Sequence, residues 1–182
     1  MMLLRSEIAR KVLGYFFLNP HEQLYTNEIA KNLNLDKRNL VKKLKEFEKD
    51  GLLKKTARGN MRLYSINGKY PLYNEYRKII LTTAGAEESL KKILAGFPDI
   101  SEAYVYGSYA RDAMDAHSDI DLLVVGGHSV LALQRKLTAL QKTLGREINA
   151  VNMDAKEFNE KKENNDPFIA GILNGKKLRV YP

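Results

Sequence analysis

The pattern of apolar and polar positions changes near residue 100 of the chain. Before it, apolar side chains recur mostly every three or four residues, which is typical of helices. We expect one helix over residues 1–18, a short helix that begins at a Thr26 cap, and a longer helix over 37–49 that begins at an Asp36 cap. Two further helices are expected over 70–83 and 87–94. A hairpin is expected over 52–66, with its turn at Gly59-Asn60. The first 69 residues are therefore predicted to form three helices and then a hairpin.

After residue 100, short and strongly apolar runs alternate with amphipathic stretches. We expect strands over 100–106, 120–125, 147–153 and 178–181, and helices from Ser108 and over 130–144, 155–161 and 167–173. This alternation predicts a small mixed sheet flanked by helices, so the fold class is α/β (α+β). Three parts follow: a helical module over residues 1–69, a connector helix over 70–85, and an α/β domain over 86–182.

The composition narrows the class of protein. The 182 residues contain no cysteine, which excludes a disulfide framework and thiolate metal sites. No apolar run approaches the roughly 18 residues that a membrane span needs. Residues 1–18 carry four charged side chains and predict an amphipathic helix rather than a signal peptide. We therefore expect a cytoplasmic protein with no membrane partner.

The positive charge is confined to one part of the chain. The formal net charge is +8, and residues 1–69 hold 15 Lys and Arg against 7 Asp and Glu, which gives the whole surplus. Residues 70–182 hold 15 of each. A basic module joined to a neutral one favours a unit that binds a polyanion, although a solvated basic surface has the same charge.

The predicted helix over 37–49 concentrates that charge on one side. Leu40, Leu44 and Phe47 share one face, and four cations spaced by three or four residues share the other. The expected DNA-binding residues are Lys37, Arg38, Asn39, Lys42, Lys45 and Lys49 on this helix, with Arg58 and Arg62 on the hairpin. Double-stranded DNA is the favoured partner, while contact with RNA and a plain solvated face remain alternatives.

The string TNEIAKNLNLDKRNLVKKLKEFEKDGLL, with the charged hairpin after it, resembles the winged helix-turn-helix domains of prokaryotic transcription regulators. The resemblance covers about a third of the chain. It implies that the helix Asp36–Lys49 contacts DNA. Winged-helix DNA binders often act as dimers on two half-sites, so a homodimer is a further expectation.

The string YVYGSYARDAMDAHSDIDLLVV carries the candidate chemistry. Gly107-Ser108 follows a predicted strand and opens a helix, where a glycine allows close approach and free N–H groups favour a phosphate. Arg111 lies one turn further and could contact a phosphate through two hydrogen bonds.

Two carboxylates follow, at Asp119 and Asp121. Residues i and i+2 of a strand point to the same face, and two such carboxylates repel unless a cation lies between them. Mg²⁺ is the usual choice, with Mn²⁺ as an equivalent. The structural alternative is a turn cap at Asp119 and a frayed strand end at Asp121.

Gly107-Ser108, Ala110-Arg111 and Ser118-Asp119-Ile120-Asp121-Leu122 together resemble the minimal members of the nucleotidyltransferase fold, the polymerase-beta-like nucleotidyltransferase domain. The resemblance covers roughly residues 87–182. It implies that Gly107 and Ser108 hold a triphosphate and that Asp119 and Asp121 bind two Mg²⁺ ions. Arg111 and Ser118 complete the expected nucleotide-binding residues. The implied reaction transfers a nucleoside monophosphate from an NTP, with ATP expected, and releases pyrophosphate.

The sequence departs from this family at one position. A third carboxylate is usual on the next long strand, where the aligned residue is the amide Asn149, and Glu147 two residues earlier is the possible replacement. Three functions stay open. The first is a DNA-binding protein that transfers a nucleotide to a protein or RNA. The second is a transcription regulator or antitoxin-like protein that only binds nucleotide. The third is an RNA-directed transferase.

Overall fold

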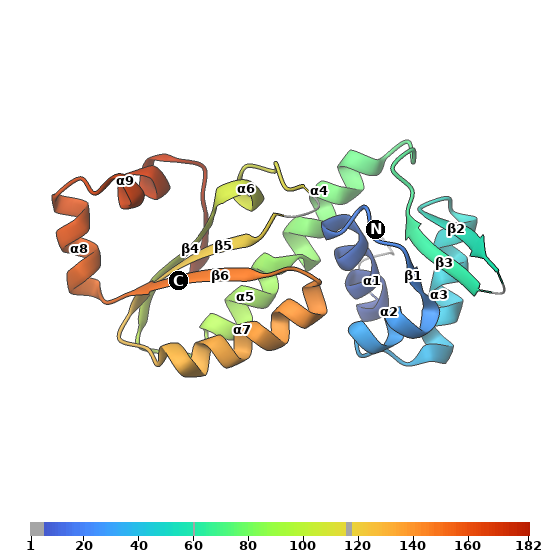
Figure 1. The fold of residues 1–182 in the computed structure, drawn as a ribbon, viewed down its shortest axis with the longest axis horizontal. Coiled ribbons are helices and arrows are strands. Elements are labelled where there is room, and N and C mark those ends of the chain that lie inside the picture. Colours follow the sequence, from blue (N-terminus) through green and yellow to red (C-terminus); the bar gives the residue numbers. More distant parts are fainter. Residues whose placement is uncertain (1–5, 60, 116–117) are drawn as a thin grey trace. The chain divides into compact units, whose positions relative to one another are not determined.

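The computed structural model describes residues 6–59, 61–115 and 118–182 of the chain, which divides into two compact units (Figure 1). The first unit is Met1–Ala86 and the second is Glu87–Pro182. The predicted helix start at residues 1–5, Asn60 of the predicted turn and residues 116–117 of the second motif lie outside the described residues. Each unit has a hydrophobic core of its own.

The first unit contains four described helices and a small antiparallel sheet. In chain order these are α1 (Glu7–Leu18), β1 (Leu24–Tyr25), α2 (Thr26–Asn32), α3 (Lys37–Lys49), β2 (Leu53–Arg58), β3 (Met61–Ile66) and α4 (Tyr73–Ala84). The sheet order is β1-β3-β2, with β3 paired to both neighbours in antiparallel fashion. The three predicted helices and the hairpin are present in the predicted order.

Local chemistry explains where these helices begin. The Ser6 hydroxyl caps α1 by accepting a hydrogen bond from Ala9 N at 3.3 Å, and Asp36 Oδ1 caps α3 through Asn39 N at 2.9 Å. The cap of α2 differs from the prediction. Tyr25 rather than Thr26 precedes the helix, and Glu28 accepts a hydrogen bond from Tyr25 N at 2.8 Å. A glutamate at the third helical position replaced the expected hydroxyl cap.

The core of the first unit lies between α1, α3 and the sheet. Phe16, Phe17, Leu40 and Phe47 are completely buried in it. Ile80 of α4 is 1% exposed and belongs to the same core. The helix that we expected as a connector therefore contributes apolar contacts to the first unit.

The second unit is a four-stranded mixed sheet with helices. It contains α5 (Ala86–Leu94), β4 (Ile100–Tyr106), α6 (Gly107–Ala110), β5 (Ile120–Gly126), α7 (Val130–Leu144), β6 (Ile148–Met153), α8 (Ala155–Glu163), α9 (Pro167–Asn174) and β7 (Leu178–Tyr181). The strand order is β6-β5-β4-β7. Only β5 and β6 are parallel, whereas β4 is antiparallel to β5 and β7. The predicted small mixed sheet flanked by helices is confirmed.

The central strand β5 is apolar on both faces. Leu122, Leu123 and Val124 are completely buried. Leu123 packs in a cluster with Phe158 of α8 and Ile169 of α9. Because alternate residues of a strand point to opposite faces, Leu122 and Val124 face the other side of the sheet. Packing on both faces holds β5, and the polar residues at its start, in one position.

Candidate active site

Three strands meet at one end of the second sheet and bring the predicted polar residues together. Strand β4 ends there at Tyr106, and β5 and β6 begin there. Asp121 pairs with Tyr106 on one side and with Asn149 on the other. The main-chain pairing, rather than any flexible loop, therefore places Asp121 between the Gly107 turn and the following strand.

Gly107 lies directly against the Asp121 carboxylate. Its φ of +69° is in the left-handed region, which favours glycine. A Cβ atom built at this position would lie 1.9 Å from Asp121 Oδ2 and 2.9 Å from Asp121 Cγ. The absence of a side chain at Gly107 is thus what allows the turn and the carboxylate to approach each other.

The turn continues into the short helix α6. Tyr109 and Ala110 are buried, so the turn is anchored in the fold. Ser108 is half-buried in the first turn of the helix, and its carbonyl oxygen accepts a hydrogen bond from Ala113 N at 2.9 Å. Arg111 follows at the C-cap with an exposed side chain. Its positive charge offsets only part of the rise in the pKa of Asp121 that burial and Asp119 cause.

The position of Asp121 beside Asp119 disfavours the ionised Asp121 carboxylate. Burial and, next, the negative charge of Asp119 raise the pKa of the Asp121 carboxyl, and Arg111 opposes this only in part. Asp119 Oδ2 accepts a hydrogen bond from Asn149 Nδ2 at 2.9 Å. A cation bound between the carboxylates would relieve their repulsion.

Glu147 lies directly before the first residue of strand β6. Strand β6 begins at Ile148, one residue later than expected. The carbonyl oxygen of Glu147 accepts a hydrogen bond from Ile120 N at 3.0 Å, and its side chain is exposed. Glu147 and Asn149 are both exposed and Ile148 between them is buried, so the alternation of the strand continues through Glu147. Among the described residues, the charges that shift the pKa of Asp121 are those of Asp119 and Arg111, not that of Glu147.

The hydroxyl of Ser118 is occupied within its own loop. It donates a hydrogen bond to Asp115 Oδ1 at 2.8 Å and accepts one from Asp115 N at 2.9 Å. The Ser118 carbonyl oxygen accepts a hydrogen bond from Arg146 Nη1 at 3.0 Å. These contacts hold the chain just before Asp119, and a nucleotide contact by Ser118 stays a prediction.

The donor set suits a hard divalent cation. Within residues 6–59, 61–115 and 118–182, no group of three or more His, Cys, Asp or Glu side chains is placed to hold a metal. What the site offers is two Asp carboxylates, with the Asn149 amide beside them. Carboxylate and amide oxygens fit Mg²⁺ and Mn²⁺, so the residues present are compatible with the metal that the resemblance implies.

A cavity of about 350 Å³ adjoins the Gly107 turn. It lies between that turn and α9, and its lining consists of Tyr106, Gly107, Arg111, Pro167, Phe168, Gly171, Ile172, Gly175 and Lys176. The sequence pattern predicted Gly107 and Arg111 as site residues, but not Tyr106, Phe168 and Lys176. No local signal marks these three, since Tyr106 belongs to an apolar strand and Phe168 to a short apolar helix.

The second unit of the chain matches a known protein family. Residues 88–178 match the family described as polymerase beta, nucleotidyltransferase, which is half of the 182 residues. The chain belongs to this family. The matched range contains Gly107, Ser108, Asp119, Asp121 and Asn149.

Solved structures with some likeness to this nucleotidyltransferase are of low identity. A toxin–antitoxin structure with AMP-PNP is 17% identical with a TM-score of 0.40, and the match covers 53% of this chain and 73% of that chain. A mutant of the toxin–antitoxin MntA-HpeT is 15% identical with a TM-score of 0.39, and the match covers 52% of this chain and 72% of that chain. A protein from Sulfolobus solfataricus described as a nucleotidyltransferase is 21% identical with a TM-score of 0.29, and the match covers 52% of this chain and 74% of that chain. No curated protein matches the chain.

The basic residues of the first unit of this nucleotidyltransferase share an exposed surface on α3. Leu40, Leu44 and Phe47 are buried. The predicted residues Lys37, Arg38, Asn39, Lys42, Lys45 and Lys49 are all exposed on this helix. Arg58 at the end of β2 and Arg62 in β3 are exposed on the hairpin. In the described part of the chain, no helix is long and apolar enough to cross a membrane.

Ion pairs separate two kinds of cation on this surface. Lys43 pairs with Glu46, and Lys55 pairs with Glu48 at 2.7 Å. Within the described part of the chain, Arg38, Lys42, Lys45 and Lys49 enter no ion pair. These last four residues, called the α3 stripe below, therefore present uncompensated positive charge to solvent.

Proposed function

We propose that the chain binds double-stranded DNA through its first unit, and that its second unit transfers a nucleoside monophosphate from an NTP to a protein or RNA acceptor. ATP is the expected donor, and pyrophosphate is released. The observation that carries the proposal is the contact between the Gly107 turn and Asp121, in a family of nucleotidyltransferases. It unites a phosphate turn and a carboxylate pair in one site.

The side chains of the second unit would have separate roles. Asp119 and Asp121 would hold one or two Mg²⁺ or Mn²⁺ ions, which supply positive charge at the reacting phosphate. The backbone N–H groups at Gly107 and Ser108 would receive the triphosphate, with Arg111 at its edge. Tyr109 and Ala110 are buried and keep this turn in place. A turn held in one position would orient the substrate before reaction.

The test of transfer uses ATP labelled at the α-phosphate. The protein is incubated with this ATP and Mg²⁺, first alone and then with cell lysate, and labelled protein and RNA are separated on gels. Label on a protein or RNA is the expected result. Binding of ATP without any transferred label would remove the transferase proposal and leave nucleotide sensing.

One observation favours that second candidate function, a regulator or antitoxin-like protein whose second unit only binds nucleotide. Asn149 donates a hydrogen bond to Asp119, so its amide nitrogen faces the carboxylate. An amide cannot accept the proton that an attacking hydroxyl loses, and in this orientation its oxygen is directed away from Asp119. Asn149 therefore supports slow transfer or none.

We predict that Asn149→Asp accelerates transfer in the labelled-ATP assay. A carboxylate at this position can accept the hydroxyl proton and adds a charge to the metal site, and a positioned base typically contributes about 10²–10⁴-fold. We expect a gain of at least about tenfold, because the third carboxylate also adds repulsion. The matched variant is Glu147→Gln, which should change little. A parent that is fast and is slowed only by Glu147→Gln would assign the base to Glu147.

The DNA-binding part of the proposal draws on the first unit. Its order of helix, strand, two helices and two strands is compatible with a winged helix, in which α3 would be the helix that enters the major groove. The α3 stripe supplies charge for the phosphate backbone, and Arg58 and Arg62 would extend it along the hairpin. RNA stays the alternative ligand of the same surface.

We predict that replacing Lys42 and Lys45 together by Ala weakens DNA binding by about tenfold or more. Each phosphate contact releases counterions, so the slope of log affinity against log salt should also fall by about two. Fluorescence anisotropy over a salt series measures both quantities, with duplex DNA and RNA compared.

The matched control removes two other cations. Lys43 and Lys55 are held by Glu46 and Glu48, so replacing both by Ala should leave the salt slope nearly unchanged. Equal effects of the two double variants would mean that only net charge matters. Unchanged DNA affinity in the Lys42 and Lys45 variant would show that the α3 stripe is a solvated face.

A further inference from the structure

The cavity beside the Gly107 turn has an unusual combination of side chains. One wall is formed by Tyr106 and Phe168, whose rings meet edge to face with centroids 5.9 Å apart and an interplanar angle of 84°. Phe168 is nevertheless 42% exposed, which is high for an aromatic side chain that already has a ring partner. A large part of the Phe168 side chain is thus accessible to a ligand.

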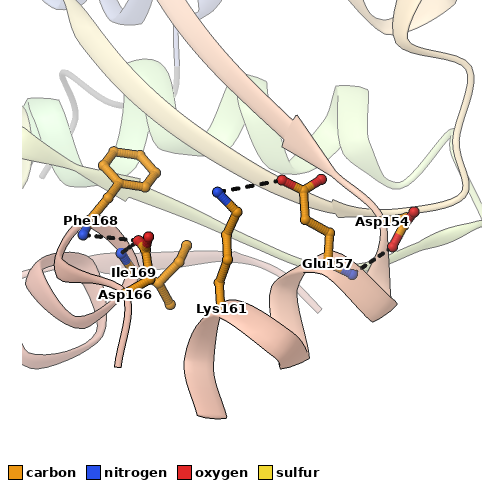
Figure 2. Close-up of polar contacts among 6 residues, drawn as sticks. All are labelled: Asp154, Glu157, Lys161, Asp166, Phe168 and Ile169. Atoms are coloured by element: carbon orange, nitrogen blue, oxygen red, sulfur yellow. Dashed lines mark hydrogen bonds and ion pairs between the residues drawn. The ribbon is translucent and has the colours of Figure 1, made fainter. Parts of the chain in front are cut away.

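The backbone of α9 holds Phe168 in this position. Asp166 Oδ1 accepts hydrogen bonds from Phe168 N at 3.0 Å and from Ile169 N at 3.1 Å (Figure 2). The start of α9 is thereby capped by its own carboxylate, so it does not attract an anion. Figure 2 shows the Phe168 ring directed away from this cap. The capping bonds therefore fix the backbone from which the ring extends at the cavity wall.

Charge and space complete the site. Arg111 and Lys176 are the charged residues of the lining, and both are cations. A Cβ atom at Gly171 would meet nothing within 4 Å, so α9 presents open space there. An exposed aromatic side chain, two cations and a cavity that begins at the Gly107 turn suit a molecule that is aromatic at one end and anionic at the other.

We propose that this cavity receives the base of the nucleoside triphosphate, which stacks on Phe168 while Lys176 and Arg111 contact its phosphates. This inference rests on the proposed function of the second unit. The described lining residues include no carboxylate or amide side chain, and the proposal assigns its two cations, Arg111 and Lys176, to the phosphates, so stacking is the main contact of the base. The site therefore takes ATP and GTP with similar affinity, because stacking does not depend on exocyclic groups.

The experiment separates the base from the phosphates. Calorimetry in the presence of Mg²⁺ compares ATP, GTP and inorganic tripolyphosphate on the full chain. Phe168→Ala should weaken ATP and GTP by about 10- to 100-fold, the effect of losing one stacked base, and leave tripolyphosphate within about twofold. Phe168→Trp should restore both nucleotides. Lys176→Ala should weaken all three ligands.

Two further variants control for damage to the fold. Gly171→Leu fills the cavity, so it should weaken both nucleotides but not tripolyphosphate. Leu131→Ala removes an apolar side chain that is 66% exposed on α7, outside the cavity, and should have no effect.

The outcomes distinguish the inference from the proposed function. A parent that binds neither nucleotide nor tripolyphosphate would overturn both. If the Phe168→Ala variant binds ATP as tightly as the parent does, only the stacking site is overturned. The same holds if Phe168→Ala weakens tripolyphosphate binding as much as it weakens ATP binding. If the parent binds ATP more than about tenfold more tightly than GTP, the site does distinguish the two bases, and the inference that stacking is their main contact is overturned.

Discussion

Gly107→Ala should abolish measurable nucleotide transfer and weaken binding of Mg²⁺ with ATP by about 10²-fold. The new methyl group would lie 1.9 Å from Asp121 Oδ2, so the carboxylate or the turn must move by an ångström or more. A displacement of about 1 Å at a reacting centre costs on the order of 10²-fold. Calorimetry and the labelled-ATP assay measure the two losses.

A second glycine separates this clash from backbone strain. Gly59 also has a positive φ, of +58°, but a Cβ atom there would meet nothing within 4 Å. Gly59→Ala should therefore carry a similar conformational cost, about 1 kcal/mol, and leave nucleotide binding intact. Thermal unfolding of both variants checks that each is folded. Near-normal transfer by Gly107→Ala would mean that the turn and Asp121 do not act together.

Asp121→Asn should separate stability from function. We expect the loss of Mg²⁺-dependent ATP binding, and a fall in any transfer of about 10²–10³-fold, the usual effect of removing a group that stabilises developing charge. The same variant should unfold at a higher temperature than the parent at neutral pH without Mg²⁺. It is nearly isosteric, and it removes a charge that burial and Asp119 disfavour.

The sign of the pH dependence follows from the raised pKa of Asp121. A carboxyl whose pKa is higher in the folded state than in the unfolded state favours folding while it is protonated. The parent should therefore lose stability relative to Asp121→Asn as the pH rises through the raised pKa, and the two proteins should converge in acid. Melting temperatures over a pH series test this. A parent that stays the more stable protein at neutral pH without Mg²⁺ would contradict the repulsion between the two aspartates.

Much of the second unit could be predicted because its signals are local. The strand runs around Val124, the glycine turn at Gly107 and the spacing of Asp119 and Asp121 are all legible in short stretches of sequence. The observed register adds what spacing alone cannot, since pairing of β5 with β6 sets Asn149 opposite Asp121. The predicted start of β6 was one residue early, and a role for Glu147 as the third carboxylate stays a prediction.

The cavity could not be predicted for a physical reason. Tyr106 and Phe168 are 62 positions apart, and they meet only because α9 packs against the sheet through Ile169 and Ile172. Sequence periodicity reports which face of a helix is apolar, but not which distant strand that face will cover. The α3 stripe was legible because all of its residues lie on one helix, whereas the ion pair between Lys55 and Glu48 joins a strand to a helix.

The close packing of Gly107 on Asp121 links two binding events that are usually treated as independent. A cation that fixes the Asp121 carboxylate would also favour one position of the turn that would hold the phosphates, since the two lie against each other. By thermodynamic reciprocity, the factor by which Mg²⁺ tightens triphosphate binding must equal the factor by which the triphosphate tightens Mg²⁺ binding. The nucleotidyltransferase unit should accordingly fill both positions together, with few molecules carrying only one of the two ligands.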